Sequence, residues 1–178
     1  MIVMKLLAFL FAFGVMSKVP PNNFYDLVIH NLNDSIINMS SFQGKNVLVA
    51  EFDASNPDHD FLATLDSLQT SNEDLEVIVV PATDFNGNLN NGQLKSLKSS
   101  VKGDFLVSET GKVEKSGGNS QLPLFKWLTD VTENTHFDVD VKTENQIFLV
   151  SSKGELFAAL GKDTPVELIS TLLKNAPR

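Results

Sequence analysis

The 178-residue chain contains no cysteine, which excludes disulfide bonds, thiolate metal sites, iron–sulfur clusters and thiol nucleophiles. Basic residues are also scarce, since 14 Lys and Arg stand against 22 Asp and Glu and the formal charge is -8. No run of Lys or Arg forms a basic patch, so we expect neither a nucleic acid nor an anionic membrane surface as a partner. With 42% hydrophobic residues, the chain can bury a core and has the length of one domain.

The first residues are typical of a secretory signal peptide. Lys5 precedes an uninterrupted apolar run from Leu6 to Met16. The run is about half of the ~20 residues that a bilayer-spanning helix needs, so we expect no stable membrane insertion. A buried N-terminal strand or helix is the alternative interpretation. Cleavage after Ser17 would leave a signal peptide at 1–17 and one domain at 18–178, exported to a periplasm, a secretory lumen or the cell exterior.

Two tripeptides match the acceptor pattern for N-glycosylation, which matters only on a eukaryotic secretory route. They are Asn33-Asp34-Ser35 and Asn38-Met39-Ser40. Chance matches are common in a chain this rich in asparagine, so the pattern alone leaves their modification open.

Apolar periodicity alternates between strand and helix along the rest of the chain. The run 47–52 is typical of a strand covered on both faces, and Glu51 is its one misfit. The resulting order of elements predicts an α/β protein with a thioredoxin-like fold, in which a central mixed sheet is flanked by helices. We expect an N-terminal β-hairpin over 24–30 and 36–39, strands at 47–52, 77–80, 147–150 and 156–160, an edge segment at 105–107, and helices at 61–68, 94–101, 122–128 and 165–173.

Capping residues precede two of the expected helices. Asp58 and Asp60 are candidate N-caps of the first helix. For the last helix, Thr164 is the expected N-cap, Pro165 the first helical residue and Glu167 the capping-box partner.

Four motifs follow one another along the chain in an order that indicates a family. They are the hairpin segment 24–27 with Ser40–Val49, the loop Val79–Gly87, the helix Pro123–Leu128 and the hairpin Lys142–Gly154. Together they resemble the corresponding segments of glutathione peroxidases, over about residues 23–174. The resemblance implies a thioredoxin-like fold and an enzyme that reduces hydroperoxides with a thiolate or selenolate, supported by a Gln, a Trp and an Asn.

The resemblance places the family's catalytic positions on residues of other types. The nucleophile position falls on Asn56, the Gln on Asp84, the Trp on Thr143 and the Asn on Glu144. An amide cannot be oxidised and reduced in the peroxide cycle, and a chain without cysteine offers no substitute thiol. We therefore expect that peroxidase catalysis has been lost.

The replacements also change the charge of the expected site. Carboxylates at Asp84 and Glu144 would repel anions, including a glutathione carboxylate or a thiolate. One interpretation is cation binding by Asp84, Glu144 and His59, with Ca²⁺ or Mg²⁺ on the oxygens, or Zn²⁺ or Mn²⁺ if the imidazole takes part. A solvated acidic loop without a ligand is favoured, since no metal-binding spacing is present. If the fold is kept, Asn56, Asp84 and Glu144 should converge on one pocket, with Asp53, Asp58, His59 and Asp60 on its rim.

Two hypotheses about function follow. The first is a secreted binding or scaffold pseudoenzyme that needs no cofactor and whose partner is an unknown protein or small molecule. The second keeps an oxidoreductase or peroxidase role in the response to oxidative stress, through a partner's thiol or a metal in the acidic site. The resemblance also implies a monomer, because the segment from Gly103 to Leu128 has no room for the inter-subunit loop of tetrameric glutathione peroxidases.

Overall fold

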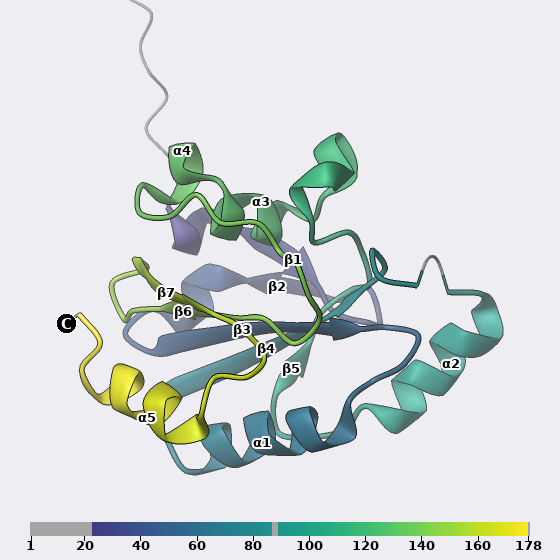
Figure 1. Cartoon of the computed structure of the whole chain (residues 1–178), viewed down its shortest axis with the longest axis horizontal. Coiled ribbons are helices and arrows are strands. Elements are labelled where there is room, and N and C mark those ends of the chain that lie inside the picture. Colours follow the sequence, from purple (N-terminus) through teal and green to yellow (C-terminus); the bar gives the residue numbers. More distant parts are fainter. Residues whose placement is uncertain (1–22, 87–88, 178) are drawn as a thin grey trace, which may run out of the picture.

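A mixed β-sheet forms the centre of the computed structural model, which describes residues 23–86 and 89–177 (Figure 1). Its strand order is β5–β4–β3–β6–β7. The first three strands in that order are parallel, whereas β6 is antiparallel to β3 and β7 to β6, which confirms the predicted thioredoxin-like architecture. The bounds are β3 (Asn46–Asp53), β4 (Leu75–Ala82), β5 (Leu106–Val107), β6 (Ile147–Val150) and β7 (Leu156–Leu160).

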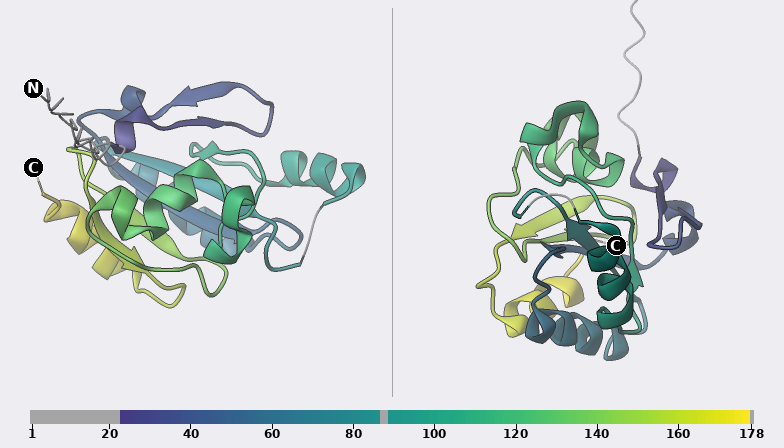
Figure 2. Two further views of the ribbon diagram at one scale, coloured as in Figure 1. Left: turned by 90° about the horizontal axis from the view of Figure 1, so that it is seen from above. Right: turned by 90° about the vertical axis from the view of Figure 1, so that its right-hand side faces the viewer.

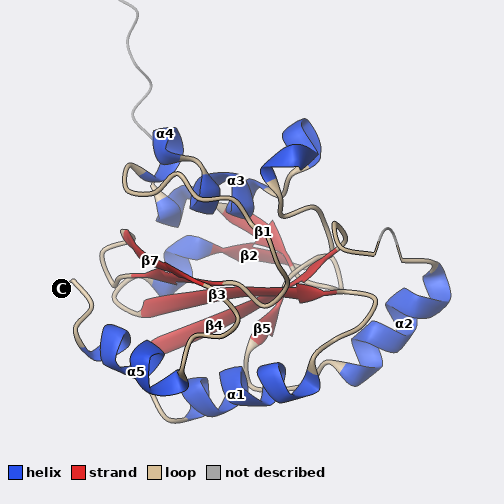
Figure 3. Ribbon diagram, in the orientation of Figure 1, coloured by secondary structure: helices blue, strands red, loops and turns tan. Residues whose placement is uncertain are grey.

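Helices and an N-terminal hairpin cover the two faces of this sheet. In Figures 1 and 3, α1 and α5 lie on one face, and α3 and α4 lie on the other, together with the β1–β2 hairpin. No helix within the described residues is long and apolar enough to cross a membrane. The bounds are β1 (Val28–His30), β2 (Ile36–Asn38), α1 (His59–Thr70), α2 (Asn91–Ser100), α3 (Pro123–Thr129), α4 (Val131–Asn134) and α5 (Val166–Lys174), with 3₁₀ turns η1 (Phe24–Asp26), η2 (Met39–Phe42) and η3 (Lys115–Ser120).

Strand β3 is apolar on both sides because it contributes to two separate cores. Val47 and Val49 pack in the cluster beneath α3 and the hairpin. The alternate residues Leu48, Ala50 and Phe52 pack in the cluster that includes buried leucines of α1 and α5. Since successive side chains of a strand point to opposite faces, this alternation also determines where the polar residues of β3 lie.

The predicted strand at 24–30 is wrong over its first half. The Asn23 side chain caps the 3₁₀ turn η1 by accepting a hydrogen bond from the Tyr25 backbone N–H at 3.1 Å. The turn itself is closed by the Asp26 N–H, which donates to the Asn23 carbonyl oxygen at 2.9 Å, so the chain is not extended there. The turn buries Phe24 completely against Trp127, with 5.2 Å between the ring centroids. Extended pairing therefore begins only at Val28.

The predicted helix caps have different outcomes. Asp60 is wrong as a cap, because it lies inside the first turn of α1. Asp58 caps α1 as expected, since its carboxylate accepts a hydrogen bond from the Phe61 N–H at 3.0 Å. The predicted cap of α5 is wrong, because the helix begins one residue later, with Pro165 at the N-cap position and no side-chain cap hydrogen bond. The Pro165 carbonyl oxygen instead accepts from Leu168 N–H at 3.0 Å and from Ile169 N–H at 3.2 Å.

Replacing the observed cap should cost stability, whereas replacing the unformed cap should not. Asp58→Ala removes the bond to Phe61 and a second one, in which Asn145 Nδ2 donates to the same carboxylate at 3.0 Å. We expect urea unfolding to show a loss of about 1 kcal/mol or more in the free energy of unfolding. Thr164→Ala is the matched control and should change it by less than about 0.5 kcal/mol. Equal losses in the two variants would contradict the assignment of the caps.

Candidate functional site

Acidic side chains gather where the central strands end. The carboxyl ends of β3 and β4 lie side by side, with Asp53 paired to Ala82. The segment before β6 joins them, because the Glu51 backbone N–H donates to the Gln146 carbonyl oxygen at 3.2 Å. Loops that follow adjacent parallel strands meet at one edge of a sheet, which is where α/β proteins place their functional groups.

Glu51 is the buried group of this edge. It lies in β3 on the same face as Val47 and Val49 and has no exposed surface. Its Oε1 accepts a hydrogen bond from the Gln146 N–H at 2.8 Å. Its Oε2 is also buried and has no hydrogen-bond partner within the described residues. An unpaired buried oxygen of this kind is costly, and the cost is greatest when the carboxyl group is ionised.

Burial raises the pKa of Glu51 from 4.5 to about 8. The hydrogen bond from Gln146 opposes this rise, and the carboxylates of Glu144, Asp84 and Asp53 add to it by repulsion. Glu51 is therefore mostly protonated at neutral pH, when it carries an O–H group that can donate a hydrogen bond.

Asp53 and Asp84 are held by hydrogen bonds on the same edge. Asp53 was expected on the rim of a pocket, but it is only 3% exposed. It accepts hydrogen bonds from the backbone N–H and hydroxyl of Ser55, both at 2.9 Å, and from Asn86 Nδ2. Asp84 is half-buried, and its Oδ2 accepts from the Val113 N–H at 2.6 Å. Both carboxylates thus bind the backbone or side chains of neighbouring loops.

The remaining predicted site residues lie at the surface. Asn56 is exposed in the turn after β3, where its backbone N–H donates to the Asp53 carbonyl oxygen at 3.2 Å. Thr143 and His59 are also exposed. Of the predicted site residues, Asp84 and Glu144 lie close enough to Glu51 for their negative charges to raise its pKa. Within the described residues, no hydrogen bond or ion pair joins either carboxylate to Asn56 or His59.

Glu144 borders a hollow of about 400 Å³ between the start of α1 and the loop before α5. Its oxygen lies 4.0 Å from the Lys162 ammonium nitrogen, and both side chains are partly exposed. Asp84 is not among the residues that line this hollow. The two carboxylates therefore both act on the charge of Glu51 without both lining this hollow. The acidic residues around the hollow are Asp58, Asp60, Glu144 and Asp163.

The hypothesis of cation binding gains no support from the side-chain geometry. Across 23–86 and 89–177, no three His, Cys, Asp or Glu side chains are grouped in a way that could hold a metal ion. Asp84 already uses one oxygen on Val113, and the Glu144 carboxylate faces Lys162. Binding at Asp84, Glu144 and His59 would require these segments to move.

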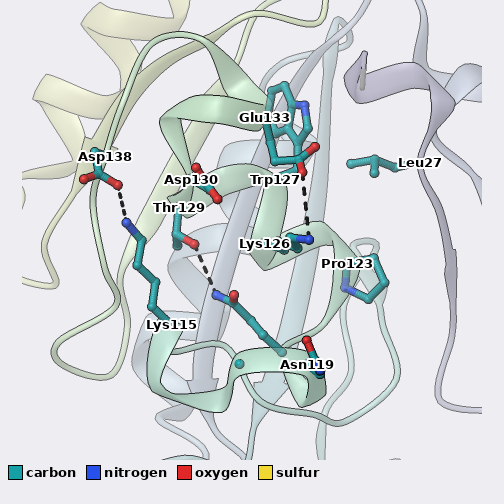
Figure 4. Close-up of a pocket in the computed structure, with 12 residues that line it drawn as sticks. Leu27, Lys115, Asn119, Pro123, Lys126, Trp127, Thr129, Asp130, Glu133 and Asp138 are labelled. Atoms are coloured by element: carbon teal, nitrogen blue, oxygen red, sulfur yellow. Dashed lines mark hydrogen bonds and ion pairs between the residues drawn. The ribbon is translucent and has the colours of Figure 1, made fainter. Parts of the chain in front are cut away.

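A larger hollow, which the sequence did not predict, lies beside α3 and α4. It has a volume of about 680 Å³, and Figure 4 shows side chains from the hairpin region, η3, α3, α4 and the loop that follows α4. Four of its five charged side chains form two ion pairs, since Lys115 contacts Asp138 and the Lys126 nitrogen lies 3.9 Å from a Glu133 oxygen. The fifth, Asp130, accepts hydrogen bonds from Thr132. Two further lining residues contact each other, since Gln121 Nε2 donates to the Thr129 hydroxyl at 3.1 Å. The lining of this hollow is polar, but its side chains do not form an arrangement of nucleophile, acid and base typical of catalysis.

Comparison with known proteins supports the fold. No protein-family model and no curated protein matches the chain. Among solved structures, Trgpx in its apo form has a TM-score of 0.69 at 21% identity, with 87% of this chain and 95% of that chain covered. GPX1 of T. cruzi has a TM-score of 0.68 at 15% identity, with 87% and 96% covered. A secreted disulfide oxidoreductase of Mycobacterium tuberculosis, homologous to DsbE of E. coli, has a TM-score of 0.55 at 10% identity, with 85% and 97% covered. The chain thus has a thioredoxin-like fold.

Replacing the buried carboxyl should remove a pH dependence of stability. Because the folded-state pKa of Glu51 is raised, its contribution to stability is fully present below the unfolded value of 4.5 and is lost as the pH rises towards about 8. In that window, wild-type protein should lose up to about 1.4 kcal/mol per pH unit from this group. Glu51→Gln should lose less over the same range, as measured by urea unfolding from pH 5 to pH 9.

The matched control is Glu73→Gln, which changes an exposed glutamate and should keep the wild-type slope. An identical slope in wild type and Glu51→Gln would contradict the assignment of a raised pKa to Glu51.

Proposed function

We propose that this chain is a glutathione-peroxidase-like pseudoenzyme that acts by binding a partner. The observation that carries the proposal is the absence of cysteine from a chain with a thioredoxin-like fold. Peroxide reduction on such a fold requires a sulfur or selenium nucleophile of low pKa. Asn56, at the position where the motif resemblance places that nucleophile, has an amide side chain.

The structural neighbours support the glutathione peroxidase part of this proposal. Two of them carry the names Trgpx and GPX1, and most of this chain superimposes on each. The motif order over residues 23–174 is a separate line of support, because it comes from the sequence alone. At 21% and 15% identity, these neighbours support the fold, and the motifs support the choice of family within it.

The electrostatics of the strand ends support loss of the original chemistry. The environment that keeps the Glu51 carboxyl neutral also disfavours any anion placed beside it, including a thiolate or the carboxylates of glutathione. The hollow beside Glu144 adds further acidic groups, with Lys162 as the basic residue that lines it. A partner that presents a cationic group there is favoured over an anionic substrate.

We also propose that the protein is exported and acts as a monomer. The apolar run from Leu6 to Met16 supports export, although this segment lies outside the described residues. A structural neighbour from Mycobacterium tuberculosis is a secreted protein, which shows that a related fold occurs outside a cytoplasm.

The proposal predicts no turnover in a peroxidase assay. Purified protein is incubated with hydrogen peroxide or a lipid hydroperoxide, and with either glutathione or thioredoxin as reductant. We expect consumption of the reductant to equal that of a heat-denatured sample, because the chain has no thiol that peroxide could oxidise to a sulfenic acid. Turnover above the denatured sample, with any pair of substrates, would contradict the proposal.

A restored variant serves as the matched positive control. It carries Asn56→Cys, Asp84→Gln, Thr143→Trp and Glu144→Asn, which returns the family's residues to the four positions. Peroxide-dependent oxidation of its single thiol, followed by mass spectrometry, should be faster than that of a variant with Asn56→Cys alone. Equal rates would show that the four positions do not form one site on this fold.

A further inference from the structure

The outer face of the N-terminal hairpin exposes apolar side chains that the fold does not cover. In the register of β1 and β2, Ile29 pairs with Ile37, and both pack towards the core beneath α3. The adjacent residues on each strand, Val28 and Ile36, place their side chains on the opposite, outer face. Val28 is 48% exposed and Ile36 is 66% exposed. Figure 2 shows the hairpin along one side of the molecule.

Strand β2 is also an open edge. Within the described residues it pairs only with β1. The end of β1, in contrast, is tied to the main body, because Asn31 bridges to Ser108 and the Glu109 N–H donates to the His30 carbonyl oxygen at 2.7 Å. An exposed edge with an isoleucine beside it invites pairing with another chain unless something blocks it.

The asparagines of both glycosylation tripeptides lie on this hairpin. Asn33 lies in the turn between the strands, and Asn38 is the last residue of β2. The two asparagines and their acceptor-pattern serines, Ser35 and Ser40, are all exposed. No other Asn in the sequence is followed at the second position by Ser or Thr. Met39 of the second tripeptide is buried and lies with Ser40 in the following turn η2, but both asparagines lie on the exposed hairpin.

The side chains of these two asparagines are free to react, unlike that of a neighbouring asparagine. Asn31 holds the turn, since its Oδ1 accepts from the Asn33 N–H at 2.8 Å and from the Ser35 N–H at 3.0 Å. The side-chain amides of Asn33 and Asn38 make no hydrogen bond within the described residues, and the Asn38 side chain does not cap η2. Attaching a group to either amide nitrogen thus breaks no contact of the fold.

The register places Asn38 among the exposed apolar residues. It lies directly opposite Val28 and two residues from Ile36 on the same strand, so all three side chains share the outer face. Directly opposed residues in an antiparallel pair have Cβ atoms about 5 Å apart. The first sugar attached to Asn38 would therefore lie over Val28 and beside Ile36.

We propose that Asn33 and Asn38 are N-glycosylated, and that the Asn38 glycan covers the apolar outer face and free edge of the hairpin. The proposal rests on export through a eukaryotic secretory route. The side-chain nitrogen forms a bond to the anomeric carbon of an oligosaccharide carried on a lipid pyrophosphate. The bond from that carbon to the pyrophosphate oxygen breaks, the lipid pyrophosphate leaves with the electron pair, and the amide nitrogen loses one proton to a base. No oxidation or reduction takes place.

The test is expression of the full chain, with its own N-terminal segment, in a eukaryotic secretory cell line. Wild-type protein from the medium should shift in two steps on partial digestion with an amidase that releases N-glycans. Asn33→Gln and Asn38→Gln should each leave one step, and the double variant none. Ser40→Ala should remove the same glycan as Asn38→Gln while keeping the asparagine, and Asn119→Gln, an exposed asparagine outside the pattern, should keep both steps.

The outcomes separate this inference from the proposed export. Protein that reaches the medium without glycans would overturn the inference and leave export intact. Protein retained in the cells without glycans would overturn both. Protein retained with both glycans would support the inference, because only entry into the lumen permits the transfer.

A second measurement tests the covering role of the Asn38 glycan. Enzymatic removal of the glycans should increase the binding of a hydrophobic fluorescent dye to the folded protein. The increase should disappear in a Val28→Thr/Ile36→Thr variant, which makes the same face polar. Unchanged dye binding after removal of the glycans would contradict the covering role.

Discussion

Glu51 places a carboxyl group inside the sheet at the point where β3, β4 and the segment before β6 meet. Its two oxygens are buried, one is bound by the Gln146 N–H, and the other has no partner in the described part of the chain. Three neighbouring carboxylates interact with other residues. Asp53 and Asp84 accept hydrogen bonds from Ser55 and Val113, and Glu144 lies near Lys162. Their negative charges favour the neutral form of Glu51. Burial and these charges together keep that carboxyl mostly protonated at neutral pH.

This constraint bears directly on function. A peroxide-reducing thiol or selenol must ionise easily, and ionisation is favoured by cationic groups, hydrogen-bond donors or a helix N-terminus. The strand ends instead combine burial with several carboxylates, and together these raise the pKa of Glu51. The absence of cysteine and the electrostatics therefore agree, although they are independent observations. Both support the proposal that this thioredoxin-like fold does not carry out peroxide reduction.

Local sequence signals predicted the architecture well but could not predict the site. The hairpin at 147–160 was predictable because Gly154 occupies a turn with φ of +80°, and Asp58 was predictable as a helix cap. The 3₁₀ turn at Phe24 was missed because the hydrogen bond from the Tyr25 N–H to the Asn23 side chain, together with the backbone hydrogen bonds of the turn, outweighs strand propensity there. Glu51 was visible as a misfit in an apolar run, but its contact with Gln146 joins residues 95 positions apart. The separation of Asp84 from the hollow beside Glu144 likewise depends on how distant loops pack.

The central claim is that the strand ends hold a neutral buried carboxyl group and disfavour anions. Carbon-13 NMR titration of the Glu51 side-chain carboxyl, assigned by comparison with the Glu51→Gln variant, measures this most directly. We expect a titration midpoint near pH 8. A midpoint near 4.5, the value of an ordinary glutamate, would contradict the account, because the site would then accept a negative charge without penalty.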